Sequence, residues 1–258
     1  SPVVAYMASG VKAAGFAAMI RVFVVGFGQY SDTWQPAIYG LAVATLLVGA
    51  VLAVRQTDVK RMLAYSSISH AGFVLVSVEA ATAKGISSAL FYLGAYTFMV
   101  AGSFAVVTVA GSTLHGRHDL AGYKGLAKER PLVALSFTVF LLAQAGVPFT
   151  TGFFAKFSVI AAAVDARSFW LAIVAMVSSV ISAYLYLRIV FTMFATDDHG
   201  HGHDAVATPV AKRPVPFGAA VVIGVCVLVT IGFGIVPWIV ENAARDAVPV
   251  LVSASGLG

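Results

Sequence analysis

Charged residues are scarce in this 258-residue chain, at 10% of the composition, whereas 60% of the residues are hydrophobic. An average soluble domain carries roughly 25% charged residues. The apolar runs also show no regular polar face, so a water-facing amphipathic surface is excluded. The shortage of charge therefore indicates a protein whose outer surface contacts membrane lipid.

Cysteine is almost absent, because Cys226 is the only one and it lies in an apolar run. A lone cysteine forms no internal disulfide or metal cluster, so we expect Cys226 to be a packing residue. The sequence also lacks a phosphate-binding glycine loop, a CxxC pair and a nucleophile elbow. We therefore expect no redox centre, no hydrolytic site, no bound cofactor and no metal.

One histidine-rich segment leaves a second interpretation open. Three histidines alternate with glycine among aspartates, a composition that binds metal weakly or forms a solvated loop, and we favour the loop. The residues are His199, His201, His203, Asp197, Asp198 and Asp204.

Long apolar runs dominate what is present. A helix needs about 20 apolar residues to cross the hydrocarbon core, and seven stretches approach that length. We predict an all-α polytopic membrane protein with one membrane domain over residues 1–258, a fragment of a longer chain. The predicted spans are approximately 3–26, 37–54, 60–80, 86–113, 132–162, 168–195 and 215–240.

The basic residues gather in alternate connecting segments. Residues 55–61, 114–131 and 196–214 hold most of the arginines and lysines that lie between spans, whereas the other connections are mixed in charge. The positive-inside rule makes the basic set cytoplasmic, which places the C-terminus outside. The net charge of +5 is then explained by topology, and no nucleic-acid partner is expected.

The fifth stretch is too long for one span and contains a helix-breaking cluster. Pro148 removes a backbone donor, and Gly146 and Gly152 weaken the helix on either side. Irregular backbone at membrane depth is tolerated where it is buried in protein or lines a wet cavity. We predict a broken helix here, with a passive proline kink as the alternative.

Three ionisable residues fall deep inside predicted spans. Lys12 lies about nine residues into the first span, Lys156 follows the predicted break, and His70 is ten residues past Lys60. Charges at the bilayer centre are costly and generally face protein or water, so we predict proton-translocating roles for all three. Lys60, Tyr65, Ser66 and Ser69 form a possible supporting polar path on the helix of His70.

Three segments resemble a known family. Residues 1–21, 56–72 and 145–157, in this order, are similar to the antiporter-like membrane subunits of complex I (NADH-quinone oxidoreductase) and to Mrp-type cation/proton antiporters. The resemblance implies helices 8–14 of a fourteen-helix fold, with a second broken helix near Pro148. It also implies that Lys12 is the central lysine of helix eight and Lys156 the lysine of broken helix twelve.

The resemblance further implies a function. Residues 91–99 lack the histidine or lysine of many relatives and resemble the subunit N branch of the family. A proton-translocating subunit of a quinone-reducing enzyme in the bacterial plasma membrane is then expected. FMN, iron-sulfur clusters and quinone would be held elsewhere in the complex, and subunits M and K would be neighbours. A cation/proton antiporter subunit and a non-conducting scaffold remain the alternatives.

Overall fold

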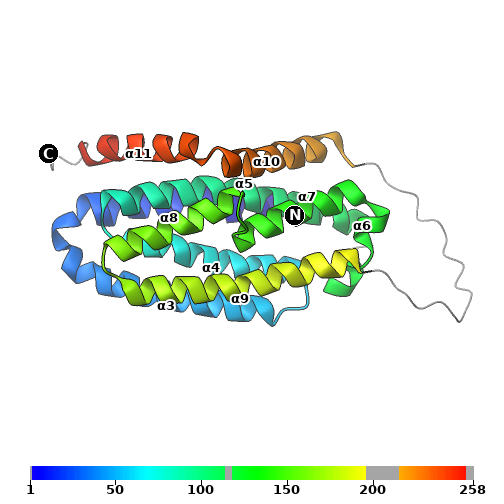
Figure 1. Cartoon of the computed structure of the whole chain (residues 1–258), viewed down its shortest axis with the longest axis horizontal. Coiled ribbons are helices and arrows are strands. Elements are labelled where there is room, and N and C mark those ends of the chain that lie inside the picture. Colours follow the sequence, from blue (N-terminus) through cyan, green and yellow to red (C-terminus); the bar gives the residue numbers. More distant parts are fainter. Residues whose placement is uncertain (1, 114–117, 196–214, 254–258) are drawn as a thin grey trace, which may run out of the picture.

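The computed structural model describes residues 2–113, 118–195 and 215–253. Within these ranges the regular elements longer than a single bridge are helices, which confirms the predicted all-α class. In Figure 1, α10 and α11 follow one another along one edge of the molecule, and α3 and α9 lie along the opposite edge. Helices α4, α5, α7 and α8 lie between these edges.

The N-terminal region is one helical run that alternates between α and π geometry. Two π-helical turns interrupt it, one directly before Lys12 and one at Arg21. The elements are α1 (Pro2–Tyr6), η1 (Met7–Val11), α2 (Lys12–Ile20), η2 (Arg21–Gly26) and the short η3 (Gly28–Tyr30).

Apart from the four-residue η4 and α6, the remaining helices are longer and nearly parallel or antiparallel (Figure 1). They are α3 (Ser31–Val54), α4 (Val59–Glu79), α5 (Ala83–Thr113), η4 (Leu120–Tyr123), α6 (Leu126–Glu129), α7 (Pro131–Ala145), α8 (Thr151–Asp165), α9 (Phe169–Phe194), α10 (Phe217–Ile235) and α11 (Pro237–Ser253).

Five helical segments of the described chain are long and apolar enough to cross a membrane: Val3–Gly26, Gly28–Val54, Ala83–Gly111, Phe169–Phe194 and Phe217–Ile235. The predicted count of about seven is not confirmed. Helix α4 carries Lys60, Arg61 and Glu79, and α7 and α8, at 15 residues each, are shorter than a full span. The final helix also differs from the prediction, because it stops at Ile235 and restarts at Pro237, whose missing N–H suits a first helical position.

The break predicted near Pro148 separates α7 from α8. Gly146 adopts φ 92°, a left-handed conformation that glycine reaches without strain, and it ends α7. The first turn of α8 then packs tightly on the last turn of α7. A Cβ added at Gly152 would overlap the Ala143 carbonyl. Helices α7 and α8 are each 15 residues long, so the break lies at the midpoint of the two half-helices.

The two ends of the helical bundle carry different polar groups. At the end we call the Lys60 end, the Val59 N–H donates to the His118 carbonyl at 2.8 Å, and Arg188 Nη1 donates to the Val54 carbonyl at 3.2 Å. At the opposite end, the Glu79 end, Lys84 Nζ pairs with Asp165 Oδ2 at 2.6 Å. The charged residues of the connections thus lie at the ends of the helices.

Gly152→Ala is expected to destabilise the protein by about 1–3 kcal/mol, since the new methyl must push α8 away from α7. The matched control is Gly224→Ala in α10, where no atom lies within 4 Å of an added Cβ. Thermal unfolding of the two purified variants in detergent measures the difference. Equal midpoints for Gly152→Ala and the unsubstituted protein would contradict the close approach of the half-helices.

Candidate functional site

Lys156 lies beside the helix break with its ammonium group inside the protein. The residue is 5% exposed, and Nζ donates to the Ala145 carbonyl and to Ser179 Oγ, each at 3.0 Å. Ala145 is the last residue of α7, so its carbonyl belongs to the unpaired, partly negative end of that half-helix. The break therefore supplies the acceptor that holds the buried cation.

The sequence makes room for this side chain through Gly146. A Cβ at that position would lie 3.1 Å from Lys156 Cδ. Pro148 lies between the half-helices, where its missing N–H costs no helical hydrogen bond. The glycine thus both ends α7 and clears the path by which Lys156 reaches the Ala145 carbonyl.

His70 is 4% exposed and lies near the middle of α4. Its Nδ1 is 2.6 Å from the Tyr92 hydroxyl and its Nε2 is 2.9 Å from the Tyr186 hydroxyl. Tyr186 also donates to Gln144 Oε1 at 3.4 Å. Both ring nitrogens are therefore paired, and a hydroxyl on each side can accept or return a proton.

Lys12 approaches the same region from α2. Its Nζ donates to the carbonyl and to the hydroxyl of Ser67, each at 2.6 Å. The ammonium also lies 5.1 Å from the centre of the Tyr96 ring, a cation–π distance. Lys12 therefore contacts α4 at Ser67, three residues before His70.

These contacts connect the three predicted residues through neighbouring aromatic rings. The Tyr96 ring, which faces Lys12, is 4.8 Å from the His70 ring, and the Phe73 ring is 6.4 Å from His70 on another side. Lys156 Nζ in turn lies 5.2 Å from the centre of the Phe73 ring. His70 is therefore linked by aromatic contacts to Lys12 and to Lys156, and we call this arrangement the polar axis.

The supporting residues predicted from sequence are Lys60, Tyr65, Ser66 and Ser69, and of these Ser66 interacts with Tyr186, a partner of His70. Ser69 Oγ is 2.9 Å from Ser178 Oγ and joins α4 to α9, while Ser66 donates to the Leu63 carbonyl of its own helix. The Tyr65 ring packs on the core. Lys60 lies at the end of α4, two turns and more from His70.

Sequence reasoning missed the uncharged members of the polar axis. Tyr92, Tyr186 and Ser67 carry no charge, so burying them in a membrane span has no unusual energetic cost. The sequence alone therefore did not single them out. Gln144 did offer a signal, since it is an amide within a long apolar run, and it proves to donate to Ser103 Oγ at 2.7 Å.

Glu79 is a further buried polar residue that the sequence did not single out. It is 7% exposed, Oε1 accepts from Ser168 at 2.9 Å, and Oε2 has no partner among the described residues. A buried carboxyl thus closes α4 at the end opposite Lys60.

At the Lys60 end, the connection that follows α5 folds against the start of α4. The pKa of the His118 imidazole is lowered, first by its burial and then by the charge of Lys60. A neutral imidazole therefore lies beside this end of α4.

No group of three or more His, Cys, Asp or Glu side chains is arranged for a metal within the described ranges. The histidines and aspartates between Asp197 and Asp204 lie outside those ranges. What the site does offer is a set of proton-carrying groups: two amines, an imidazole and several hydroxyls.

Comparison with known proteins assigns the family. A family model described as "NADH:quinone oxidoreductase/Mrp antiporter, TM" matches residues 1–182. Subunit N of NADH-quinone oxidoreductase from Acidothermus cellulolyticus is 46% identical over 97% of this chain and 47% of its own length. Subunit N 1 from Solibacter usitatus is 40% identical over 96% of this chain and 50% of its own.

Solved structures agree with this assignment. A chain of respiratory complex I from Thermus thermophilus is 30% identical, with a TM-score of 0.75 over 94% of this chain and 51% of that one. A chain of the membrane-bound sulfane sulfur reductase, an archaeal respiratory membrane complex, is 26% identical with a TM-score of 0.83, over 100% and 51% of the two chains.

The chain therefore belongs to the antiporter-like membrane subunits that complex I shares with Mrp antiporters. Within that family the relatives quoted above are subunit N of NADH-quinone oxidoreductase. The chain spans about half the length of the curated relatives it matches.

Proposed function

We propose that this chain is the proton-translocating part of a subunit N of NADH-quinone oxidoreductase and that protons move along the polar axis. The observation that carries the proposal is the position of His70 between Lys12 and Lys156, with both ring nitrogens hydrogen-bonded to tyrosine hydroxyls. Buried amines and an imidazole in a membrane domain are costly, and such groups commonly mark ion paths.

In the proposed mechanism, Lys12 and Lys156 exchange protons through His70 and the hydroxyls of Tyr92 and Tyr186, and water carries the proton past the Phe73 ring, which has no exchangeable hydrogen. A proton on either lysine disfavours a second charge in the same poorly solvated region, so loading one site promotes release from the other. The Ala145 carbonyl and Ser179 stabilise the charged form of Lys156. His70 relays protons because one ring nitrogen accepts while the other donates.

The same relatives support a proposal for the partners and the location. We propose that the subunit lies in a bacterial plasma membrane beside subunits M and K, with FMN, iron-sulfur clusters and quinone held by other parts of the complex. Charge bias places the Lys60 end in the cytoplasm and the Glu79 end outside, with the C-terminus on the outer side.

Lys156→Arg is expected to abolish most proton pumping, because an arginine keeps the positive charge but does not release its proton at physiological pH. Lys156→Glu should retain part of the activity, since a carboxyl group still titrates. Proton pumping per electron, measured in proteoliposomes that contain the fully assembled complex, gives the answer. Lys128→Arg, at an exposed position near α7, is the control. Full pumping by Lys156→Arg would favour the non-conducting scaffold.

Tyr186→Phe is expected to slow pumping about tenfold, since it removes the hydroxyl between His70 Nε2 and Gln144 and leaves buried polar atoms unpaired at a cost of about 1–3 kcal/mol. Tyr184→Phe, two residues earlier on α9 at an exposed position, should have no effect. Both variants are compared at equal levels of assembled complex. Unchanged pumping by Tyr186→Phe would remove Tyr186 from the path.

The proposed orientation is tested with single cysteines in a Cys226→Ser background. A membrane-impermeant maleimide added to intact cells should label Thr33→Cys, at the Glu79 end, and should label Lys128→Cys only after the cells are opened. The reversed pattern would show that the Lys60 end faces outward.

A further inference from the structure

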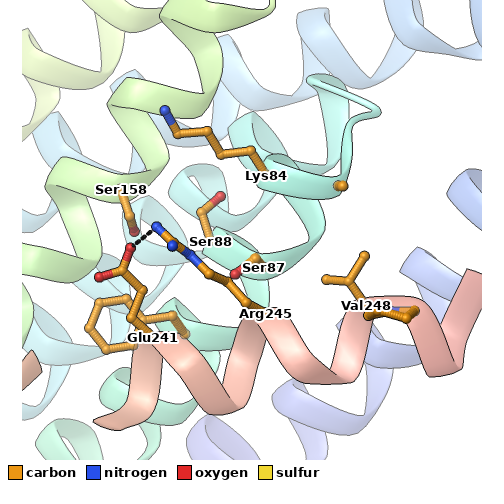
Figure 2. Close-up of a pocket in the computed structure, with 10 residues that line it drawn as sticks. Lys84, Ser87, Ser88, Ser158, Glu241, Arg245 and Val248 are labelled. Atoms are coloured by element: carbon orange, nitrogen blue, oxygen red, sulfur yellow. Dashed lines mark hydrogen bonds and ion pairs between the residues drawn. The ribbon is translucent and has the colours of Figure 1, made fainter. Parts of the chain in front are cut away.

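A cavity of about 500 Å³ lies away from the polar axis, between the start of α5, α8 and α11. Figure 2 shows Lys84, Ser87 and Ser88 on α5, Ser158 on α8, and Glu241, Arg245 and Val248 on α11 around it. None of these residues belongs to the proposed proton path, so the cavity calls for a separate explanation.

One side of the cavity carries two cations, each paired with a carboxylate, and Glu241 itself lines the cavity. Arg245 is exposed over 65% of its side chain and pairs with Glu241 Oε1 at 2.5 Å, as the dashed line in Figure 2 marks. The Lys84 ammonium pairs with Asp165 and remains 49% exposed. Each cation thus keeps free N–H groups after its ion pair, because guanidinium has five donors and ammonium has three.

Ser87 adds a hydroxyl to this polar side. It is 8% exposed and lines the cavity, and no hydrogen bond joins its hydroxyl to another residue in the part of the chain described. The neighbouring serines differ, since Ser88 donates to the Gly85 carbonyl and Ser158 to the Ala155 carbonyl. A buried hydroxyl usually finds a partner, so Ser87 is suited to a ligand in the cavity.

The rest of the cavity is apolar. Phe91 on α5 and Val248 and Pro249 on α11 form this part of the wall. A free inorganic anion would satisfy the cations and the serine but would leave the apolar wall facing water. An amphiphile with an anionic head and a hydrocarbon tail satisfies both parts.

The depth of the cavity matches such a molecule. The helix break is level with Met99 of α5, because Met99 Sδ would be 3.2 Å from a Cβ on Gly152. Since the break divides two equal half-helices, we take it as the membrane centre. Ser87 is 12 residues from Met99, or about 18 Å along the helix, and Lys84 is about 22 Å away. Half of the hydrocarbon core is about 15 Å, so the cations lie at headgroup depth.

Phe91 lies on the other side of that boundary. It is eight residues from Met99, or about 12 Å, which falls within the hydrocarbon region. Along α5 the cavity therefore runs from Lys84 and Ser87 at headgroup depth to Phe91 at acyl-chain depth, which is the order of a phospholipid. Helix α11 starts at the break, so its Arg245 lies about 16 Å and its Val248 about 21 Å from Gly234, both at headgroup depth.

We propose that this cavity binds one glycerophospholipid of the membrane leaflet at the Glu79 end. Arg245, Ser87 and Lys84 hold the phosphate group, and an acyl chain lies along Phe91. The bound lipid fills the space between α5 and α11 and fixes α11 against the bundle. The proposal is independent of the proton path.

The test uses the complete complex in nanodiscs of phosphatidylethanolamine and phosphatidylglycerol, with a small fraction of phosphatidylethanolamine that carries a photoactivatable diazirine in one acyl chain. After illumination, mass spectrometry of peptides is expected to find the label on the segments around Phe91 and Glu241, the parts of α5 and α11 that line the cavity at acyl-chain depth. No label on either segment, at normal assembly, would overturn the proposal and would show that other protein closes the cavity.

Variants then separate headgroup recognition from simple contact with the bilayer. Arg245→Gln with Ser87→Ala should reduce labelling of these segments at least fivefold, whereas Arg61→Gln, an exposed arginine at the Lys60 end, should leave it unchanged. A diacylglycerol probe with the same diazirine but no phosphate should label weakly and respond to neither variant. Equal labelling of the double variant and the unsubstituted complex would contradict phosphate binding.

Two further experiments test whether the label reports lipid outside the cavity and whether the cavity binds free phosphate instead of lipid. Val248→Trp should fill the cavity and abolish the label near Phe91, and persistence of that label would place the lipid outside the cavity. Excess inorganic phosphate should not compete with the lipid probe, because it gains nothing from the apolar wall. Strong competition would mean that the site binds free phosphate, against the proposal.

Discussion

The interaction on which the rest of the structure depends is the contact between the Lys156 ammonium and the end of half-helix α7. An intact helix would use the Ala145 carbonyl internally, and Lys156 would then be a buried cation without a backbone acceptor. Interrupting the helix leaves that carbonyl free, at the partly negative end of the helix dipole, and brings Ser179 of α9 to the same ammonium. Gly146 is required twice, for its left-handed conformation and for the space it leaves beside Lys156.

The remainder of the polar axis is built from neutral groups, and this keeps the number of buried charges small. Tyrosine hydroxyls contact both nitrogens of His70, and Gln144 contacts one of these hydroxyls, so the two nitrogens have partners whichever one carries the proton. A carboxylate in the same place would fix one protonation state of the imidazole by its charge. Neutral hydroxyls favour neither nitrogen strongly, and a group that must both accept and return a proton benefits from that balance.

Much of this architecture could be predicted from particular residues. Pro148 between two glycines predicted the break, because proline and glycine alter backbone energetics wherever they occur. Lys12, Lys156 and His70 were identifiable because a charge within an apolar run is costly in any fold. Tyr92 and Tyr186 were not, since a buried tyrosine is common and its partner lies on another helix. The roles of Ser66 and Ser69 also depend on helix rotation, which a weakly amphipathic sequence such as that of α4 does not fix.

The helix break also determines how the last two helices pack. A Cβ added at Gly234 would contact the backbone of Phe149 and Thr150, so α10 passes directly over the gap between the half-helices, and Thr151 Oγ1 donates to the Thr230 carbonyl at 2.7 Å. Helix α10 ends at Ile235, one residue after Gly234, and α11 continues along α5. The irregular backbone of the break is therefore covered on this side by protein, which meets the requirement that unpaired backbone groups avoid lipid. Because α11 continues from this contact, whatever fixes α11 against α5 also helps to hold α10 over the break and its unpaired backbone.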